Sequence, residues 1–97
     1  MTEETTEKSQ DNTVFIGKKP SISYVLAVVT QFTDGRNEIF LKARGKAISK
    51  AVDVAEIVRN KFVTDAKVNK IIIGTEKLET ENKEKINVST IEIAIGK

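Results

Sequence analysis

One construction occurs twice in the first half of the chain, and it limits the folds that the chain can adopt. The short apolar run Val14–Ile16 is followed by glycine, a lysine pair and a helical pattern. The apolar run at residues 39–43 is likewise followed by Arg44-Gly45-Lys46 and a second helical pattern. Two consecutive strand–helix units predict parallel strands joined by right-handed crossovers, whose carboxyl ends open on one edge of the sheet.

Both helical patterns show apolar residues at intervals of three and four, which is typical of amphipathic helices. The first helix is expected over residues 20–32, with Pro20 at its first helical position, and the second over residues 46–62. The expected buried positions are Ile22, Val25, Leu26, Val29 and Phe32 in the first helix and Ile48, Val52, Ala55, Val58 and Phe62 in the second. The second helix has more apolar surface than one small sheet requires, so we expect part of it to face another subunit.

The last third of the chain has the character of a long β-hairpin. Apolar and alternating segments at residues 68–76 and 87–96 flank a polar, charged stretch in which Asn82 is available for a turn. With strands at 13–17 and 38–43, the predicted order is β-α-β-α-β-β. The expected fold is an α/β chain of the two-layer α+β type, with a mixed four-stranded sheet and both helices on one face.

Composition excludes several classes of function. The chain has no cysteine and no histidine, which removes thiolate and imidazole metal sites and Ser/His or Cys nucleophile systems. Carboxylates such as Asp53 and Glu56 lie on a patterned helix and are expected to form surface ion pairs. We therefore expect no enzyme, no metal and no cofactor. No apolar run approaches the length of a membrane span, so a cytoplasmic protein without membrane contact is expected.

The charge is unevenly distributed along the chain. Residues 1–12 have a net charge of −3, whereas residues 13–97 have a net charge of +5. The first segment is rich in Thr, Glu, Ser and Gln, and we expect a disordered acidic leader followed by a single domain at 13–97.

The two strand-to-helix junctions carry the candidate functional residues. Lys18 and Lys19 occupy the first, and Lys42, Arg44 and Lys46 surround Gly45 at the second. Cationic side chains beside free helix N–H groups suit phosphate oxygens. Taken singly, a cluster of this kind is better explained as a solvated basic turn. Convergence of both clusters on one sheet edge favours a phosphate-binding surface.

Several blocks of the sequence closely resemble the archaeal Alba chromatin proteins. These are IGKKP from Ile16, YVLA from Tyr24, the block KARGKAISKAVDVAEIVRNKF at residues 42–62 and VSTIEIAI from Val88. The resemblance implies a dimeric, non-enzymatic protein that binds double-stranded DNA and RNA with little sequence preference. It also implies the fold of the C-terminal domain of translation initiation factor three.

Carried onto this chain, the resemblance adds further site residues. It implies Lys50 in the basic face, acetylation at Lys18, and Phe62 in contacts between dimers along a duplex, although Phe62 fits an ordinary core position equally well. The hairpin of such proteins tends to be basic, whereas residues 76–87 here sum to −1. We therefore expect Lys83 and Lys85 at the tip to contribute weakly.

The predicted function is sequence-independent binding of DNA duplexes, with coating, compaction or bridging of the chromosome by homodimers. Affinity should arise chiefly from counterion release and should fall steeply with salt. The principal alternative is an RNA-binding protein or ribonucleoprotein subunit, because the same surface suits A-form helices. A protein–protein adaptor predicts instead that neutralising the cations leaves function intact.

Overall fold

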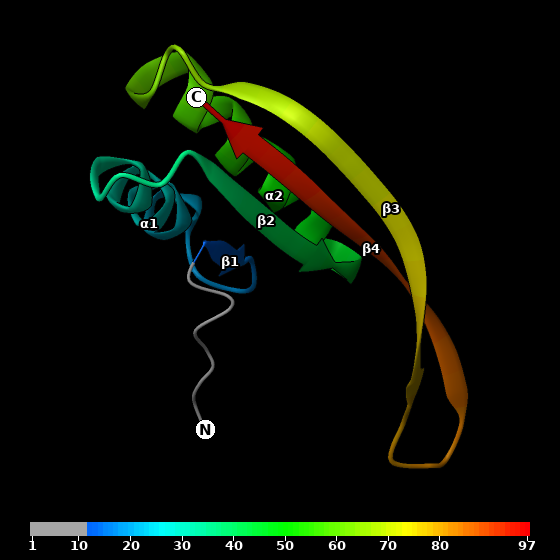
Figure 1. Ribbon diagram of the computed structural model, residues 1–97. Helices are drawn as coiled ribbons and strands as arrows, with labels where there is room; N and C mark the ends of the chain where they lie inside the picture. Colours follow the sequence, from blue (N-terminus) through cyan, green and yellow to red (C-terminus); the bar gives the residue numbers. More distant parts are fainter. Residues whose placement is uncertain (1–11) are drawn as a thin grey trace.

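A computed structural model describes residues 12–97, and it confirms the predicted β-α-β-α-β-β order (Figure 1). The elements are β1 (Thr13–Phe15), α1 (Ser21–Thr33), β2 (Glu38–Arg44), a 3₁₀ turn η2 (Gly45–Ala47), α2 (Ile48–Ile57), a π-helical turn η3 (Val58–Phe62), β3 (Lys67–Glu79) and β4 (Lys85–Gly96). The strand order is β1-β2-β4-β3. β1 runs parallel to β2, and the β2–β4 and β4–β3 pairs are antiparallel, so the sheet is mixed.

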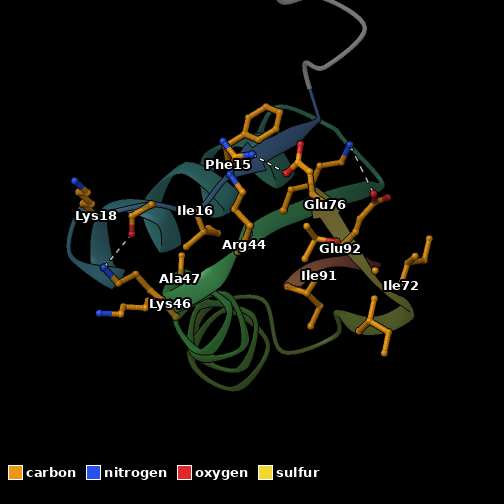
Figure 2. A pocket seen from close by; sticks show the side chains of 17 residues that line it. Phe15, Ile16, Lys18, Arg44, Lys46, Ala47, Ile72, Glu76, Ile91 and Glu92 are labelled. Carbon is orange, nitrogen blue, oxygen red and sulfur yellow. Dashed lines mark hydrogen bonds and ion pairs between the residues drawn. The ribbon is translucent and has the colours of Figure 1, made fainter. Parts of the chain in front are cut away.

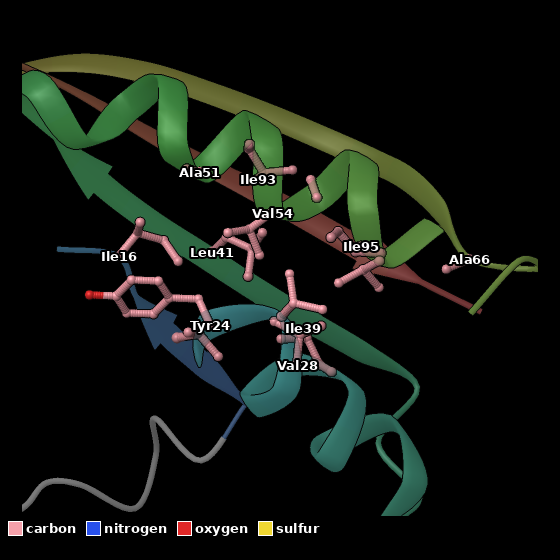
Figure 3. Close-up of a cluster of buried hydrophobic side chains, with 14 of the residues drawn as sticks. Ile16, Tyr24, Val28, Ile39, Leu41, Ala51, Val54, Ala66, Ile93 and Ile95 are labelled. Carbon is pink, nitrogen blue, oxygen red and sulfur yellow. The ribbon is translucent and has the colours of Figure 1, made fainter. Parts of the chain in front are cut away.

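The core lies between the sheet and its helical layer (Figure 3). Alternate residues Ile39, Leu41 and Ala43 of β2 face this layer, as the period-two pattern predicts. α1 packs on β1 and β2, and α2 packs on β2 and β4. Burial of a side chain the size of Ile39 or Leu41, both fully buried, stabilises the fold by about 1.5–3 kcal/mol.

The predicted buried stripes of the two helices are partly wrong. Ile22 and Leu26 of α1 are 51% and 53% exposed, and Val52 and Phe62 are also exposed. The predicted Val25, Phe32, Ala55 and Val58 are buried, and the other buried helical positions are Tyr24, Val28, Ala51 and Val54. Each helix carries two adjacent apolar stripes, and helical spacing alone does not determine which of them meets the sheet.

The N-terminal boundaries also shift slightly. Pro20 is the N-cap of α1 and not its first helical residue. Residues 1–11 of the expected leader lie outside the described residues. Asn12, the last residue assigned to it, accepts a 2.8 Å hydrogen bond from the Phe40 backbone N–H, so its backbone continues the β1–β2 pairing.

β3 and β4 extend well past the end of β2 and form a two-stranded arm (Figure 1). Arg44 ends β2 opposite Thr90, which pairs on its other side with Gly74. Residues 75–79 and 85–89 therefore pair within the hairpin over about 17 Å. At the tip, Asn82 lies in the turn, as expected, and the following residue, Lys83, adopts a left-handed conformation with φ of 64°. Among residues 12–97, no helix is long and apolar enough to span a bilayer.

Candidate nucleic-acid interface

A broad cleft opens where β2 ends, between the β1–α1 loop, the start of the second helical segment and the base of the arm (Figure 2). Its volume is about 1170 Å³. The charged side chains that line it are Lys18, Lys42, Arg44, Lys46, Lys50, Glu76 and Glu92. Five cations thus face two carboxylates, and the local charge is positive. Four of the five predicted junction cations line this one cleft, and Lys19 adjoins it in the same loop as Lys18.

Parallel pairing of β1 and β2 produces this convergence. Phe15 lies in register with Lys42, and the Ile16 backbone N–H donates a 2.8 Å hydrogen bond to the Lys42 carbonyl oxygen. The chain therefore leaves β1 beside the end of β2, and both basic junctions open on the same edge of the sheet.

Two side chains hold the loop that carries the lysine pair. The Tyr24 hydroxyl oxygen accepts hydrogen bonds from the backbone N–H groups of Gly17 (2.9 Å) and Lys19 (3.0 Å). The Lys50 ammonium donates to the carbonyl oxygens of the same two residues, at 3.1 Å and 2.7 Å. Lys50 was expected among the phosphate ligands, yet two of its three donors are used within the protein. Its direct structural role is to fix this loop.

The remaining cations fall into two groups. The side chains of Lys18, Lys19 and Lys46 are exposed and form no hydrogen bond or ion pair within the part of the chain that the structure describes. Lys42 and Arg44 are paired instead (Figure 2). Lys42 Nζ lies 3.6 Å from Glu92 Oε1, and Arg44 Nη1 donates a 2.7 Å hydrogen bond to Glu76 Oε1.

Gly45 determines the direction of the chain between the two neighbouring cations. Its φ is +60°, in the left-handed region that other L-residues adopt at a cost. Arg44 is still extended, whereas Lys46 already lies in η2. Glycine at this position allows the abrupt change from strand to helix.

The other expected site residues lie away from the cleft. Lys83 and Lys85 are at the tip of the arm. Phe62 ends η3, at the opposite end of the helical segment from the cleft, and is 47% exposed, so its reading as a core residue is wrong. Among residues 12–97, no group of three or more carboxylates is placed to hold a metal ion.

Sequence reasoning missed the residues that restrain this site. Tyr24 contacts the loop only because its ring lies on the buried side of α1, next to Gly17. Glu76 and Glu92 reach Arg44 and Lys42 only through the register of β4 with its two neighbours. In the sequence, the only sign of a role for Glu76 was its contribution to the negative net charge of residues 76–87.

Comparisons with known proteins agree on the family and the fold of this chain. The Alba family profile matches residues 12–75. A protein of Methanocella arvoryzae, named DNA/RNA-binding protein Alba, is 57% identical over 84 residues, covering 87% of this chain and 88% of its own. The structure of Alba from Thermoplasma volcanium superposes with a TM-score of 0.85 at 57% identity, over 89% of this chain and 100% of that one. A crystal structure of ALBA1 from Trypanosoma brucei gives a TM-score of 0.73 at 26% identity, over 90% of this chain and 69% of that one. With the family profile, a close relative and the fold in agreement, this chain belongs to the Alba family.

Proposed function

We propose that this protein binds nucleic-acid duplexes through their phosphate backbone, with little preference for base sequence. The observation that best supports this proposal is that both basic junctions line one cleft. Five cationic side chains and only two carboxylates line that cleft. Lysine and arginine side chains that neutralise phosphates release condensed counterions, and this release supplies most of the non-specific affinity. Contacts of this kind position a protein on a duplex but carry no sequence information.

The relatives support both DNA and RNA as ligands, because they are named DNA/RNA-binding proteins. DNA duplexes are the proposed principal ligand, with coating and compaction of the chromosome in the cytoplasm as the outcome. The second candidate is a role on structured RNA, where A-form helices are also recognised through backbone and shape. No catalytic step is assigned to the cleft.

The proposed roles of the site residues follow their surroundings. Lys18, Lys19 and Lys46 are available for phosphate at once, whereas Lys42 and Arg44 become available when their carboxylate partners are displaced. Gly45 leaves the backbone between Arg44 and Lys46 accessible to a phosphate. Acetylation of Lys18 would remove one of the available charges. Lys83 and Lys85 on the arm are secondary contacts.

We also propose that the binding unit is a homodimer. The face of β3 that continues the core surface carries Ile71 and Ile73, whose partners on β4 are Ile93 and Ile91. Ile73 is 77% exposed, and Val52 on α2 is also exposed. Apolar surface of this extent on one side of a helix and sheet is typical of subunit interfaces. A twofold dimer would bury it in both copies and place two basic clefts in one particle. Exposed Phe62 remains the candidate for contacts between dimers.

A salt titration of duplex binding tests the proposal. The natural chain and the triple variant Lys18→Ala/Lys19→Ala/Arg44→Ala would be titrated with two DNA duplexes of unrelated sequence and one RNA duplex. We expect similar affinities for both DNAs and a steep decrease with salt. The logarithmic slope of the variant should be shallower by about 0.9 for each phosphate contact removed.

A matched control removes the same charge elsewhere. Lys61, Lys67 and Lys97 are exposed and lie outside the cleft, so their triple alanine variant should retain nearly the natural slope. Equal losses in both variants would show that only net charge matters and would refute the cleft. Binding that is unaffected by either variant would favour the adaptor alternative, and the RNA titration decides which polymer is preferred.

A further inference from the structure

The ion pair between Arg44 and Glu76 connects the body of the domain to the arm. Arg44 is the last residue of β2, and Glu76 lies on β3 just beyond the point where β2 stops. β4 lies between these strands, with Thr90 opposite Arg44 and Val88 opposite Glu76. Thr90 and Val88 are two residues apart on one strand, so Arg44 and Glu76 project from the same face of the sheet. The pair therefore spans β4 at the base of the arm.

Glu76 occupies the guanidinium in the way that a phosphate would. The Nη1–Oε1 distance is 2.7 Å, which is short for a charge-assisted hydrogen bond. Carboxylate and phosphate oxygens use the same donor fork of arginine. Both side chains are accessible from the cleft, so a phosphate that binds Arg44 through Nη1 competes with this carboxylate.

Lys42 and Glu92 form a looser version of the same arrangement. Their closest N–O distance is 3.6 Å, which is beyond a good hydrogen bond. Glu92 belongs to the body part of β4, where β2 and β3 flank it on both sides. Displacing Glu92 would therefore free no segment of the chain, whereas displacing Glu76 would release a contact between body and arm.

We infer that Glu76 is an intramolecular competitor for nucleic-acid phosphate at Arg44, and that phosphate binding there releases the base of the arm from the body. This inference rests on the proposed function and assigns a regulatory carboxylate to the same cleft. The arm would then respond to phosphate binding in the cleft, because the Arg44 guanidinium binds either Glu76 or a phosphate. In the free protein the arm base is tethered, and on a duplex it is free to adjust to the groove.

The variant Glu76→Gln tests the competition. It keeps the size and polarity of the side chain and removes its charge, so duplex affinity at low salt should rise about two- to fivefold, as expected for an exposed ion pair. The salt dependence should steepen by up to about 0.9 in logarithmic slope for each Arg44 engaged. The matched control is Glu79→Gln, which makes the same charge change three residues further along β3, and its effect should be clearly smaller.

A double-mutant cycle shows whether Glu76 acts through Arg44. In an Arg44→Ala background, Glu76→Gln should have no more effect than Glu79→Gln, because the contested guanidinium is absent. Amide hydrogen exchange of residues 77–86 provides a readout independent of affinity. Exchange in the free protein should be faster in both Glu76→Gln and Arg44→Ala than in the natural chain, and duplex binding to the natural chain should accelerate exchange at the arm base.

The possible outcomes separate this inference from the proposed function. If the natural chain does not bind duplexes, the proposed function fails. If it binds with steep salt dependence while Glu76→Gln and Glu79→Gln behave alike in both backgrounds, the function stands and the competition is refuted. A full effect of Glu76→Gln that persists in the Arg44→Ala background would also overturn it, since the carboxylate would then act only as a general negative charge.

Discussion

The ammonium group of Lys50, near the start of α2, donates a 2.7 Å hydrogen bond to the carbonyl oxygen of Lys19, 31 residues earlier in the chain. The same ammonium reaches the carbonyl oxygen of Gly17, and the Tyr24 hydroxyl receives the backbone N–H groups of these two residues. The loop at residues 17–19 is therefore held by both helices. Lys50 of α2 binds its carbonyl oxygens, and Tyr24 of α1 binds its backbone N–H groups. The side chains of Lys18 and Lys19 project from a backbone whose position is fixed before any ligand arrives, which lowers the ordering cost of binding.

Replacing Lys50 by methionine should reduce stability as well as binding. Lys50→Met retains most of the aliphatic stem and removes the donors of two carbonyl groups, so the free energy of unfolding should fall by about 1–2 kcal/mol. Lys46→Met is the matched control, because the ammonium of Lys46 forms no hydrogen bond or ion pair with the described residues. It should weaken duplex binding at unchanged stability. Urea denaturation of both variants makes the comparison, and equal stabilities would show that Lys50 does not support the loop.

Removing the Tyr24 hydroxyl should loosen the same loop from its other side. Tyr24→Phe keeps the buried ring and leaves two backbone N–H groups without their acceptor, which should cost about 1–2 kcal/mol. Amide exchange at Gly17 and Lys19 should accelerate relative to the rest of β1 and α1. Thr33→Val is the control, since the Thr33 hydroxyl bonds an exposed carbonyl at the end of α1. Unchanged exchange at Gly17 would contradict the assigned role.

Gly45 should tolerate substitution poorly. At φ of +60°, an alanine Cβ crowds the following carbonyl and should destabilise the fold by about 1–2 kcal/mol. Other parts of the fold leave room for the added Cβ, because its nearest neighbour outside the adjacent residues would be Val88 Cγ1 at 3.6 Å. Gly45→Asn should therefore recover part of the loss, because asparagine enters the left-handed region more readily. Thermal unfolding of the two variants gives the answer, and an alanine variant as stable as the natural chain would refute backbone strain.

The proposed dimer surface predicts a change in oligomeric state. Ile73→Glu introduces a charge into the apolar area on β3 and should convert dimers to monomers in sedimentation equilibrium. Leu26→Glu, on the exposed side of α1, makes the same kind of change at another exposed aliphatic position and should leave the dimer intact. Dissociation by Leu26→Glu alone would move the interface from β3 to α1.

The sequence determined the elements of this fold more completely than their orientations. Period-two alternation identified the buried residues Ile39, Leu41 and Ala43 correctly, because each face of a strand receives every second residue. In α1, residues such as Leu26 and Val28 lie on adjacent stripes, and only tertiary packing decides that Val28 is buried. When a helix has apolar residues on both its buried and its exposed side, the sequence pattern does not show which side faces the core.

The candidate site shows the same division. The basic junctions were visible as local runs of lysine and arginine, and the parallel β1–β2 pairing that unites them followed from strand–helix alternation. The contact of Arg44 with Glu76 joins residues 32 positions apart. It depends on how far β3 and β4 extend and on their exact pairing, and a shift of one residue would turn Glu76 to the other face. The pattern of charges alone contains no such information.

The position of β4 in the sheet also determines how the chain folds during synthesis. β4 is the last strand along residues 12–97, yet it lies between β2 and β3 and contributes the buried residues Ile93, Ala94 and Ile95. While the ribosome is still translating this segment, α1, α2 and β2 lack the central partner of their core, and β3 has no strand beside it. The sheet can close only once residues 85–96 have left the exit tunnel, so residues 12–97 fold as one unit and not strand by strand.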